Sequence, residues 1–124
     1  MILFPVEKFY PNYRRKLFGG DDIKNLDVYA SPTDRKLGVV KDALVDGNGI
    51  FRYLVIDLKF GEISKQILVP VTSSLVDYNE RRVYVHQLNR EKIKALPEYN
   101  ETTQVDETYR QQVERIFNSL VSMS

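Results

Sequence analysis

Apolar and polar residues alternate along the middle of the chain in short runs that are separated by turn residues. The runs with this alternation cover residues 27–30, 37–46, 50–60, 65–71 and 82–88. A period of two is typical of β-strands. Between the second and third runs, the sequence Asp46-Gly47-Asn48-Gly49 contains Asp-Gly and Asn-Gly, which favour tight hairpins. Short strands with turns this close predict a mainly β chain that forms a small barrel or a sandwich.

The third run is apolar on both of its faces. Its first face carries Leu54, Ile56, Leu58 and Phe60. Its second face carries Phe51, Tyr53 and Val55. A closed barrel buries its inner face and leaves the second set outside. Burial of such a side chain is worth about 1.5–3 kcal/mol, so we expect another segment or another molecule to cover Phe51, Tyr53 and Val55.

After residue 88 the pattern changes to the period of helices. The stretch "LNREKIKALP" predicts a short helix with Asn89 as its N-cap and Pro97 at its end. A second, amphipathic helix follows a polar linker. Its apolar stripe consists of Val105, Tyr109, Val113, Ile116, Phe117 and Leu120. The predicted organisation is an irregular N-terminal arm (1–25), a barrel domain (26–98), a linker (99–104) and the amphipathic helix (105–122).

The apolar stripe of the predicted helix and the second face of the third run would both be exposed to water if nothing packed on them. We predict that they pack on each other or on a protein partner. The packing can occur within one chain or between two chains. Exchange of a terminal helix across a two-fold axis is a low-cost route to a dimer, and it favours a homodimer here. The partner-binding residues are therefore predicted to be the strand set Phe51, Tyr53 and Val55 together with the helix residues Tyr109, Val113, Ile116, Phe117 and Leu120.

Composition narrows the function classes. The chain has 124 residues, of which 43% are hydrophobic, and its 18 basic residues nearly balance its 17 acidic residues. A net charge of +1 supplies no global field that would attract nucleic acid or anionic lipid. Cysteine is absent, and no apolar run approaches the ~18 residues of a membrane span. We expect a soluble, cytoplasmic protein without a transmembrane segment.

Candidate chemical sites are few. The single histidine, His86, is expected on the outer face of the last strand. Asp46 and Asn48 are similar to the start of a calcium loop, but Ile50 occupies the next ligand position and a tight hairpin explains them better. No nucleophile–base pair or metal-ligand set is present in the sequence. We therefore predict no catalytic, cofactor-binding or metal site and expect a protein that is not an enzyme.

An RNA-binding function is the alternative. Arg14, Arg15 and Lys16 lie among aromatic residues in the arm, a combination that is typical of nucleic-acid contacts. Arg81 and Arg82 would complete the RNA-contacting set. The basic run is short and the chain is neutral overall, so the favoured interpretation is an arm that packs its aromatic residues on the barrel.

Four segments in register resemble the PRC-barrel domain family. They are "DVYASPTDRKLGVVKDALVD", "GIFRYLVIDL", "KQILVPVTSSLVDYNERRVYV" and "LNREKIKALP". The arm is also similar to that of small stand-alone cyanobacterial PRC-barrel proteins. The resemblance implies a small β-barrel that ends in a short helix, and a partner-binding rather than a catalytic module.

Two branches of the family suggest a process. One is the barrel of the photosynthetic reaction-centre H subunit, and the other is the C-terminal barrel of a ribosome-maturation factor. The sequence contains neither the membrane helix of the first nor the additional β-domain of the second. The resemblance therefore implies an adaptor that acts in the assembly or regulation of a photosynthetic (electron-transfer) or ribosomal complex, with the RNA-associated module as the alternative.

Overall fold

A computed structural model describes residues 2–10, 23–86 and 88–121, with the backbone alone at 119–121. Its strands are β1 (Leu3–Pro5), β2 (Asp27–Ser31), β3 (Lys36–Asp46), β4 (Phe51–Phe60), β5 (Ile63–Pro70), β6 (Ser74–Asp77) and β7 (Arg82–His86). Its helices are α1 (Val6–Phe9), the 3₁₀ turn η1 (Val71–Ser73), α3 (Arg90–Ala95) and α4 (Glu107–Val121). The mainly β fold class is confirmed.

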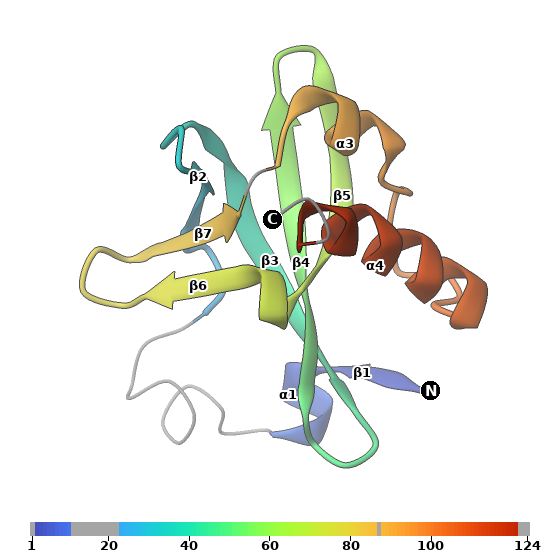
Figure 1. The fold of residues 1–124 in the computed structure, drawn as a ribbon. Helices are drawn as coiled ribbons and strands as arrows, with labels where there is room; N and C mark the ends of the chain where they lie inside the picture. Colours follow the sequence, from blue (N-terminus) through green and yellow to red (C-terminus); the bar gives the residue numbers. More distant parts are fainter. Residues whose placement is uncertain (1, 11–22, 87, 122–124) are drawn as a thin grey trace.

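The strands form one curled, seven-stranded sheet in the order β5-β4-β3-β2-β7-β6, with β1 paired to β3. Neighbouring strands are antiparallel except for β2 and β7, which are parallel. In Figure 1, β3 and β4 form a long twisted pair, and the β6–β7 hairpin projects away from it. In the part of the chain that the structure describes, no ladder joins β5 to β6, so hydrogen bonds do not close the sheet into a barrel.

The interior lies on the concave side of the sheet, where the inward residues of successive strands meet. Ile56 on β4 pairs with Val40 on β3 and with Ile67 on β5. Val83 and Val85 on β7 point the same way, and all five side chains are fully buried. Burial of this apolar set is the main force that curls the sheet.

A bulge in β3 determines which residues reach the outer face. The ladder pairs Val40 with Ile56 and then Asp42 with Val55, so Lys41 is an extra residue in β3. Simple alternation would place Val40 and Leu44 on one face. After the bulge Val40 faces the interior, whereas Asp42 and Leu44 lie on the outer face, opposite Val55 and Tyr53.

The N-terminal arm contains two short elements that the sequence pattern does not predict. β1 pairs with the end of β3, where Phe4 lies opposite Val45, and α1 follows it directly. Val6 in α1 is buried. Near the other end of the chain, Asn89 caps α3 as expected, because its side chain accepts a hydrogen bond from the N–H of Lys92 at 3.0 Å.

Candidate functional site

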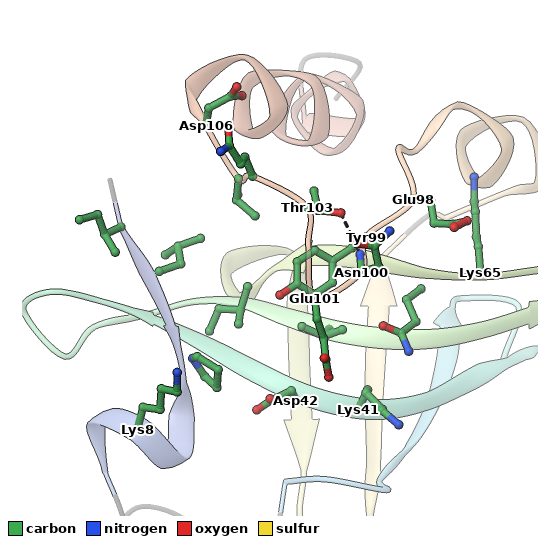
Figure 2. A pocket seen from close by; sticks show the side chains of 18 of the residues that line it. Lys8, Lys41, Asp42, Lys65, Glu98, Tyr99, Asn100, Glu101, Thr103 and Asp106 are labelled. Atoms are coloured by element: carbon green, nitrogen blue, oxygen red, sulfur yellow. Dashed lines mark hydrogen bonds between the residues drawn. The ribbon is translucent and has the colours of Figure 1, made fainter.

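A groove of about 1300 Å³ lies on the outer face of the β3–β4–β5 sheet, between the N-terminal strand and the segment that links α3 to α4 (Figure 2). We call it the linker groove. Residues of β3, β4 and β5 form its floor, namely Lys41, Asp42, Leu44, Val55, Ser64, Lys65 and Gln66. Its walls come from Ile2, Leu3, Pro5, Lys8 and Lys24 on one side and from Glu98, Tyr99, Asn100, Glu101, Thr103, Gln104, Val105 and Asp106 on the other.

Hydrogen bonds hold the linker wall against the sheet. The N–H of Tyr99 donates to the carbonyl oxygen of Gln66 on β5 at 2.8 Å. Lys65 donates from Nζ to the carbonyl oxygen of Leu96 at 2.7 Å. Tyr109 at the start of α4 donates its hydroxyl back to the carbonyl oxygen of Glu98 at 3.0 Å. The polar sequence of the linker therefore forms a fixed wall of the groove.

A tight turn shapes the middle of this wall. The N–H of Asn100 donates to the hydroxyl oxygen of Thr103 at 2.9 Å, and the N–H of Thr103 donates to the carbonyl oxygen of Asn100 at 3.0 Å. Asp106 then begins α4, because its side chain accepts a hydrogen bond from the N–H of Tyr109 at 2.9 Å. These short-range bonds set the direction in which the linker leaves the sheet.

The floor combines apolar residues with a partly buried carboxyl group. Leu44 and Val55 are buried. Burial raises the pKa of Asp42, although the N–H of Ala43, which donates to the carboxylate at 2.8 Å, and the charge of Lys24 lower it in part. Burial also raises the pKa of Tyr99, and the negative charges of Asp42 and Glu101 raise it further. A tyrosine hydroxyl thus stays protonated beside two carboxyl groups.

The rim carries charges of both signs. Figure 2 shows Glu101 extending from the linker towards the strand that bears Lys41 and Asp42. Lys8 lies on the opposite wall and is exposed. Lys24 forms an ion pair with Glu7 at 2.8 Å. A ligand in the linker groove would therefore meet apolar residues of the walls, such as Ile2 and Val105, and both cationic and anionic groups at the rim.

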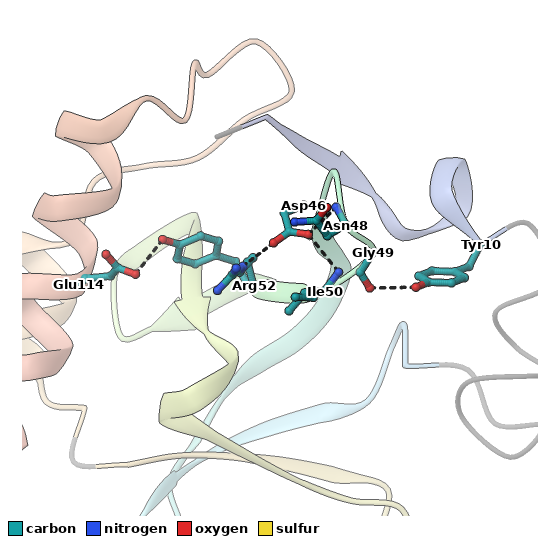
Figure 3. Close-up of polar contacts among 8 residues, drawn as sticks. Tyr10, Asp46, Asn48, Gly49, Ile50, Arg52 and Glu114 are labelled. Atoms are coloured by element: carbon teal, nitrogen blue, oxygen red, sulfur yellow. Dashed lines mark hydrogen bonds and ion pairs between the residues drawn. The ribbon is translucent and has the colours of Figure 1, made fainter.

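The outward residues of β4 are covered by different parts of the same chain. Tyr53 is buried, and its hydroxyl donates to Glu114 of α4 at 3.2 Å (Figure 3). Burial raises the pKa of Tyr53 to about 12, with a further contribution from the negative charge of Glu114. Val55 lies in the floor of the linker groove. A register shift separates Phe51 from these two, because it faces Val45 rather than Leu44.

The arm covers Phe51 instead. The ring of Tyr10 stacks on the ring of Phe51 with centroids 6.2 Å apart and planes 5° from parallel. The hydroxyl of Tyr10 donates to the carbonyl oxygen of Gly49 in the adjacent hairpin turn at 2.9 Å (Figure 3). Asp46 shapes that turn, because its carboxylate accepts hydrogen bonds from the N–H groups of Asn48 and Ile50 and pairs with Arg52 at 2.7 Å.

The predicted helix residues lie along α4 and on the segment before it. Val113 and Phe117 are buried, and Tyr109 and Ile116 are half-buried against the core. Leu120 lies in α4, but its side chain is outside the described residues. In this arrangement the strand and helix residues make their contacts within one chain, so their assignment to partner binding stays a prediction.

The structure describes only two of the five predicted RNA-contacting residues. Arg14, Arg15 and Lys16 lie outside the described residues. Arg81 is exposed in the turn between β6 and β7. Arg82 lies over the ring of Tyr29 at 4.2 Å and within 3.6 Å of Asp34. The assignment of these five residues to RNA stays a prediction.

The linker groove could not be found from sequence patterns alone. Its walls come from the arm and the linker, two segments without strong periodicity. Among the described residues, no three His, Cys, Asp or Glu side chains are grouped in a way that could hold a metal ion. None of the helices within residues 2–10, 23–86 and 88–121 has the length and apolar character needed to cross a bilayer.

Comparison with known proteins identifies the family. A family model described as the PRC-barrel domain matches residues 15–92, more than half of the chain. The chain belongs to the PRC-barrel domain family. An uncharacterized protein of Deinococcus radiodurans is 38% identical over 65 residues, which are 52% of this chain and 23% of that protein. The matched part of this PRC-barrel chain thus spans about a quarter of the length of its relative.

Proposed function

We propose that this PRC-barrel protein is a non-enzymatic interaction module that binds an extended segment of a protein partner in the linker groove. The observation that carries the proposal is the groove itself, a depression of about 1300 Å³ whose linker wall is hydrogen-bonded to the sheet. Sites for small molecules are typically about 300–1000 Å³ and mostly apolar. A larger depression with charges of both signs at its rim is better suited to a peptide.

The chemistry of the groove specifies the kind of segment. The more exposed apolar residues of the walls, Ile2, Leu3 and Val105, suit aliphatic side chains, and the half-buried ring of Tyr99 offers an aromatic contact. Aromatic residues in partly buried positions contribute a large share of binding energy in protein interfaces. Lys8 and Lys41 on one side and Glu101 on the other suit a segment that carries both acidic and basic residues.

The partner would belong to a larger assembly. The family resemblance suggests a photosynthetic (electron-transfer) or a ribosomal complex, in which this chain would act as an adaptor. An RNA-associated function draws less support from the structure, because Arg82 already lies on Tyr29 and beside Asp34.

A peptide-display library provides the test. Peptides of about ten residues would be selected on the full chain, and their affinities measured by fluorescence anisotropy. We expect Tyr99→Ala to weaken binding at least about tenfold, as loss of an aromatic anchor does. Tyr78→Ala is the matched control, because Tyr78 is exposed in the β6–β7 turn, outside the groove.

Charge reversal gives a second comparison. Lys41→Glu should change the affinity and its salt dependence, whereas Lys59→Glu, on an exposed position of β4 outside the groove, should change neither. Selected peptides whose binding depends on Tyr78 but not on Tyr99 would contradict the proposal. Failure to select any peptide, together with salt-sensitive RNA binding by the same chain, would favour the RNA-associated alternative.

A further inference from the structure

The two edges of the sheet differ. The outer side of β5 is engaged, because Gln66 accepts a hydrogen bond from the N–H of Tyr99 and Lys65 reaches the carbonyl oxygen of Leu96. At the other end of the sheet, β6 (Ser74–Asp77) has only β7 as a ladder partner within the described residues. A strand with one open side exposes backbone N–H and C=O groups that can pair with another strand.

The β6 edge lacks most features that prevent such pairing. Its sequence, Ser-Leu-Val-Asp, contains no proline and no lysine, and its single charge lies at its last residue. Leu75 is 67% exposed, more than any other large hydrophobic residue on the strands of the described chain. This degree of exposure on an open edge indicates a surface that another strand could cover.

The outer face beside this edge continues the apolar character of Leu75. The ladders place Leu75 opposite Tyr84 on β7, and Tyr84 opposite Tyr29 on β2. The two tyrosine rings lie 6.3 Å apart. A hollow of about 480 Å³ lies beside Leu75 and Tyr84, and its other lining residues are Phe117, His86, Ser31, Thr72, Ser73 and Ser74. The edge therefore adjoins a row of aromatic rings that also carries a charge, because Arg82 lies over the ring of Tyr29 at 4.2 Å.

We propose that the β6 edge pairs with the β6 edge of a second copy of this chain, antiparallel across a two-fold axis, with Leu75 opposite the partner's Leu75. Residues that are directly opposite each other in an antiparallel ladder point to the same face. A two-fold axis perpendicular to the sheet preserves that face, so Leu75 can lie opposite itself but not opposite Val76, which points to the core. Among the symmetric registers, the one centred on Leu75 joins the two exposed leucines, whereas those centred on Ser74 or Val76 would place Leu75 opposite Ser73 or Asp77.

Charge does not oppose a second copy as the occupant. In this register each Asp77 lies beyond the end of the partner strand, so the two carboxylates do not face each other. The net charge of +1 gives two copies little mutual repulsion. Three paired residues on each strand form a small interface, well below the ~1000 Å² of a stable one, so we expect a weak dimer that populates only at high concentration.

Cysteine trapping tests the register directly. The chain has no cysteine, so Leu75→Cys introduces a single thiol. Opposed residues in antiparallel pairs have Cα atoms about 4.5–5.5 Å apart, within the range of about 4.4–6.8 Å that a disulfide bridges. Mild oxidation should therefore join two Leu75→Cys chains. Ile50→Cys is the matched control, because Ile50 is 50% exposed but lies at the tip of the β3–β4 hairpin.

We expect Leu75→Cys to form disulfide-linked dimer at least about tenfold faster than Ile50→Cys at equal concentration, because only the first thiol would face its copy. Sedimentation velocity on the cysteine-free chain should show a dimer fraction that rises with concentration. Leu75→Lys should reduce that fraction, and Leu75→Thr, which keeps strand propensity, should reduce it less. Circular dichroism checks that each variant is folded.

Three results would overturn the proposal. One is a chain that stays monomeric up to millimolar concentration. Another is a Leu75→Cys chain that cross-links no faster than Ile50→Cys, which would indicate random collision or an edge that accepts a strand of a different protein. The third is a dimer that persists unchanged in a folded Leu75→Lys variant. Because β6 is outside the linker groove, none of these results bears on peptide binding there.

Discussion

The contact between Tyr53 and Glu114 tests whether α4 packs on the sheet of its own chain. Tyr53→Phe removes the hydroxyl but keeps the buried ring, and Glu114→Gln removes the charge but keeps the size of the side chain. The O–H···O distance of 3.2 Å is longer than the usual ~2.7–2.8 Å, and Glu114 is half-buried. We therefore expect Tyr53→Phe to lower the free energy of unfolding by about 0.5–1.5 kcal/mol.

A double-mutant cycle isolates the contact from other effects of each substitution. The four proteins would be unfolded in urea at low micromolar concentration, where contacts between chains are negligible. We expect a coupling free energy of about 0.5–1 kcal/mol between the two sites and little change in the denaturant slope. A coupling below about 0.3 kcal/mol, the level at which distant sites are additive, would refute the packing of α4 on β4.

The same pair predicts a dependence on alkaline pH. The pKa of Tyr53 is raised to about 12 from an ordinary value near 10. Its protonated form is favoured in the folded state, so this contribution to stability is complete below pH 10 and is lost as the pH rises towards 12. The stability difference between the natural chain and Tyr53→Phe should therefore shrink over this interval. A difference that is constant up to pH 12 would contradict the burial of the hydroxyl.

Three further perturbations follow from the fold. Phe117→Ala should lower the free energy of unfolding by about 3–5 kcal/mol if α4 unfolds together with the sheet. If α4 detaches alone, hydrogen exchange in this variant should become faster in α4 but not in β4. A Cβ atom at Gly38 would lie 2.0 Å from the carbonyl oxygen of Asp57. Gly38→Ala should therefore lower the free energy of unfolding, measured in urea, by at least about 1–3 kcal/mol through overpacking. The hydrogen bonds that the Asp46 carboxylate accepts from Arg52 and from the Ile50 N–H lower the pKa of Asp46. The contribution of Asp46 to stability is therefore present at pH values above its ordinary pKa of 3.8, and it is lost as the pH falls through the pKa of the folded state. The urea midpoint of Asp46→Asn should therefore fall less between pH 7 and pH 2.5 than the urea midpoint of the unsubstituted chain.

Strong local signals predicted most of the fold. Asp46-Gly47-Asn48-Gly49 forms the expected hairpin turn, since Gly49 has a φ of +80° and its N–H donates to the carbonyl oxygen of Asp46. Asn89 caps α3 as its side-chain chemistry favours. These features depend on a few neighbouring residues, and their physical causes are visible in the sequence itself.

Features that depend on distant residues were not predictable in this way. β1 and β6 are too short to show a period of their own, and each forms because a neighbouring strand supplies its hydrogen bonds. The bulge at Lys41 exchanges the faces of β3, and no turn residue marks it. The linker groove depends on both effects, because the bulge places Asp42 and Leu44 on the outer face and β1 forms the wall beside them.

The two terminal segments of the chain pack on apolar residues of the outer face of the sheet. Tyr10 from the arm covers Phe51, and α4 covers Tyr53. Further along β4, Val55 forms part of the floor of the linker groove. A ligand in the groove would contact the N-terminal strand β1 and the linker that precedes α4. Peptide binding should then slow hydrogen exchange in β1 and in the linker (98–106) together, whereas protection of only one of them would place the ligand elsewhere.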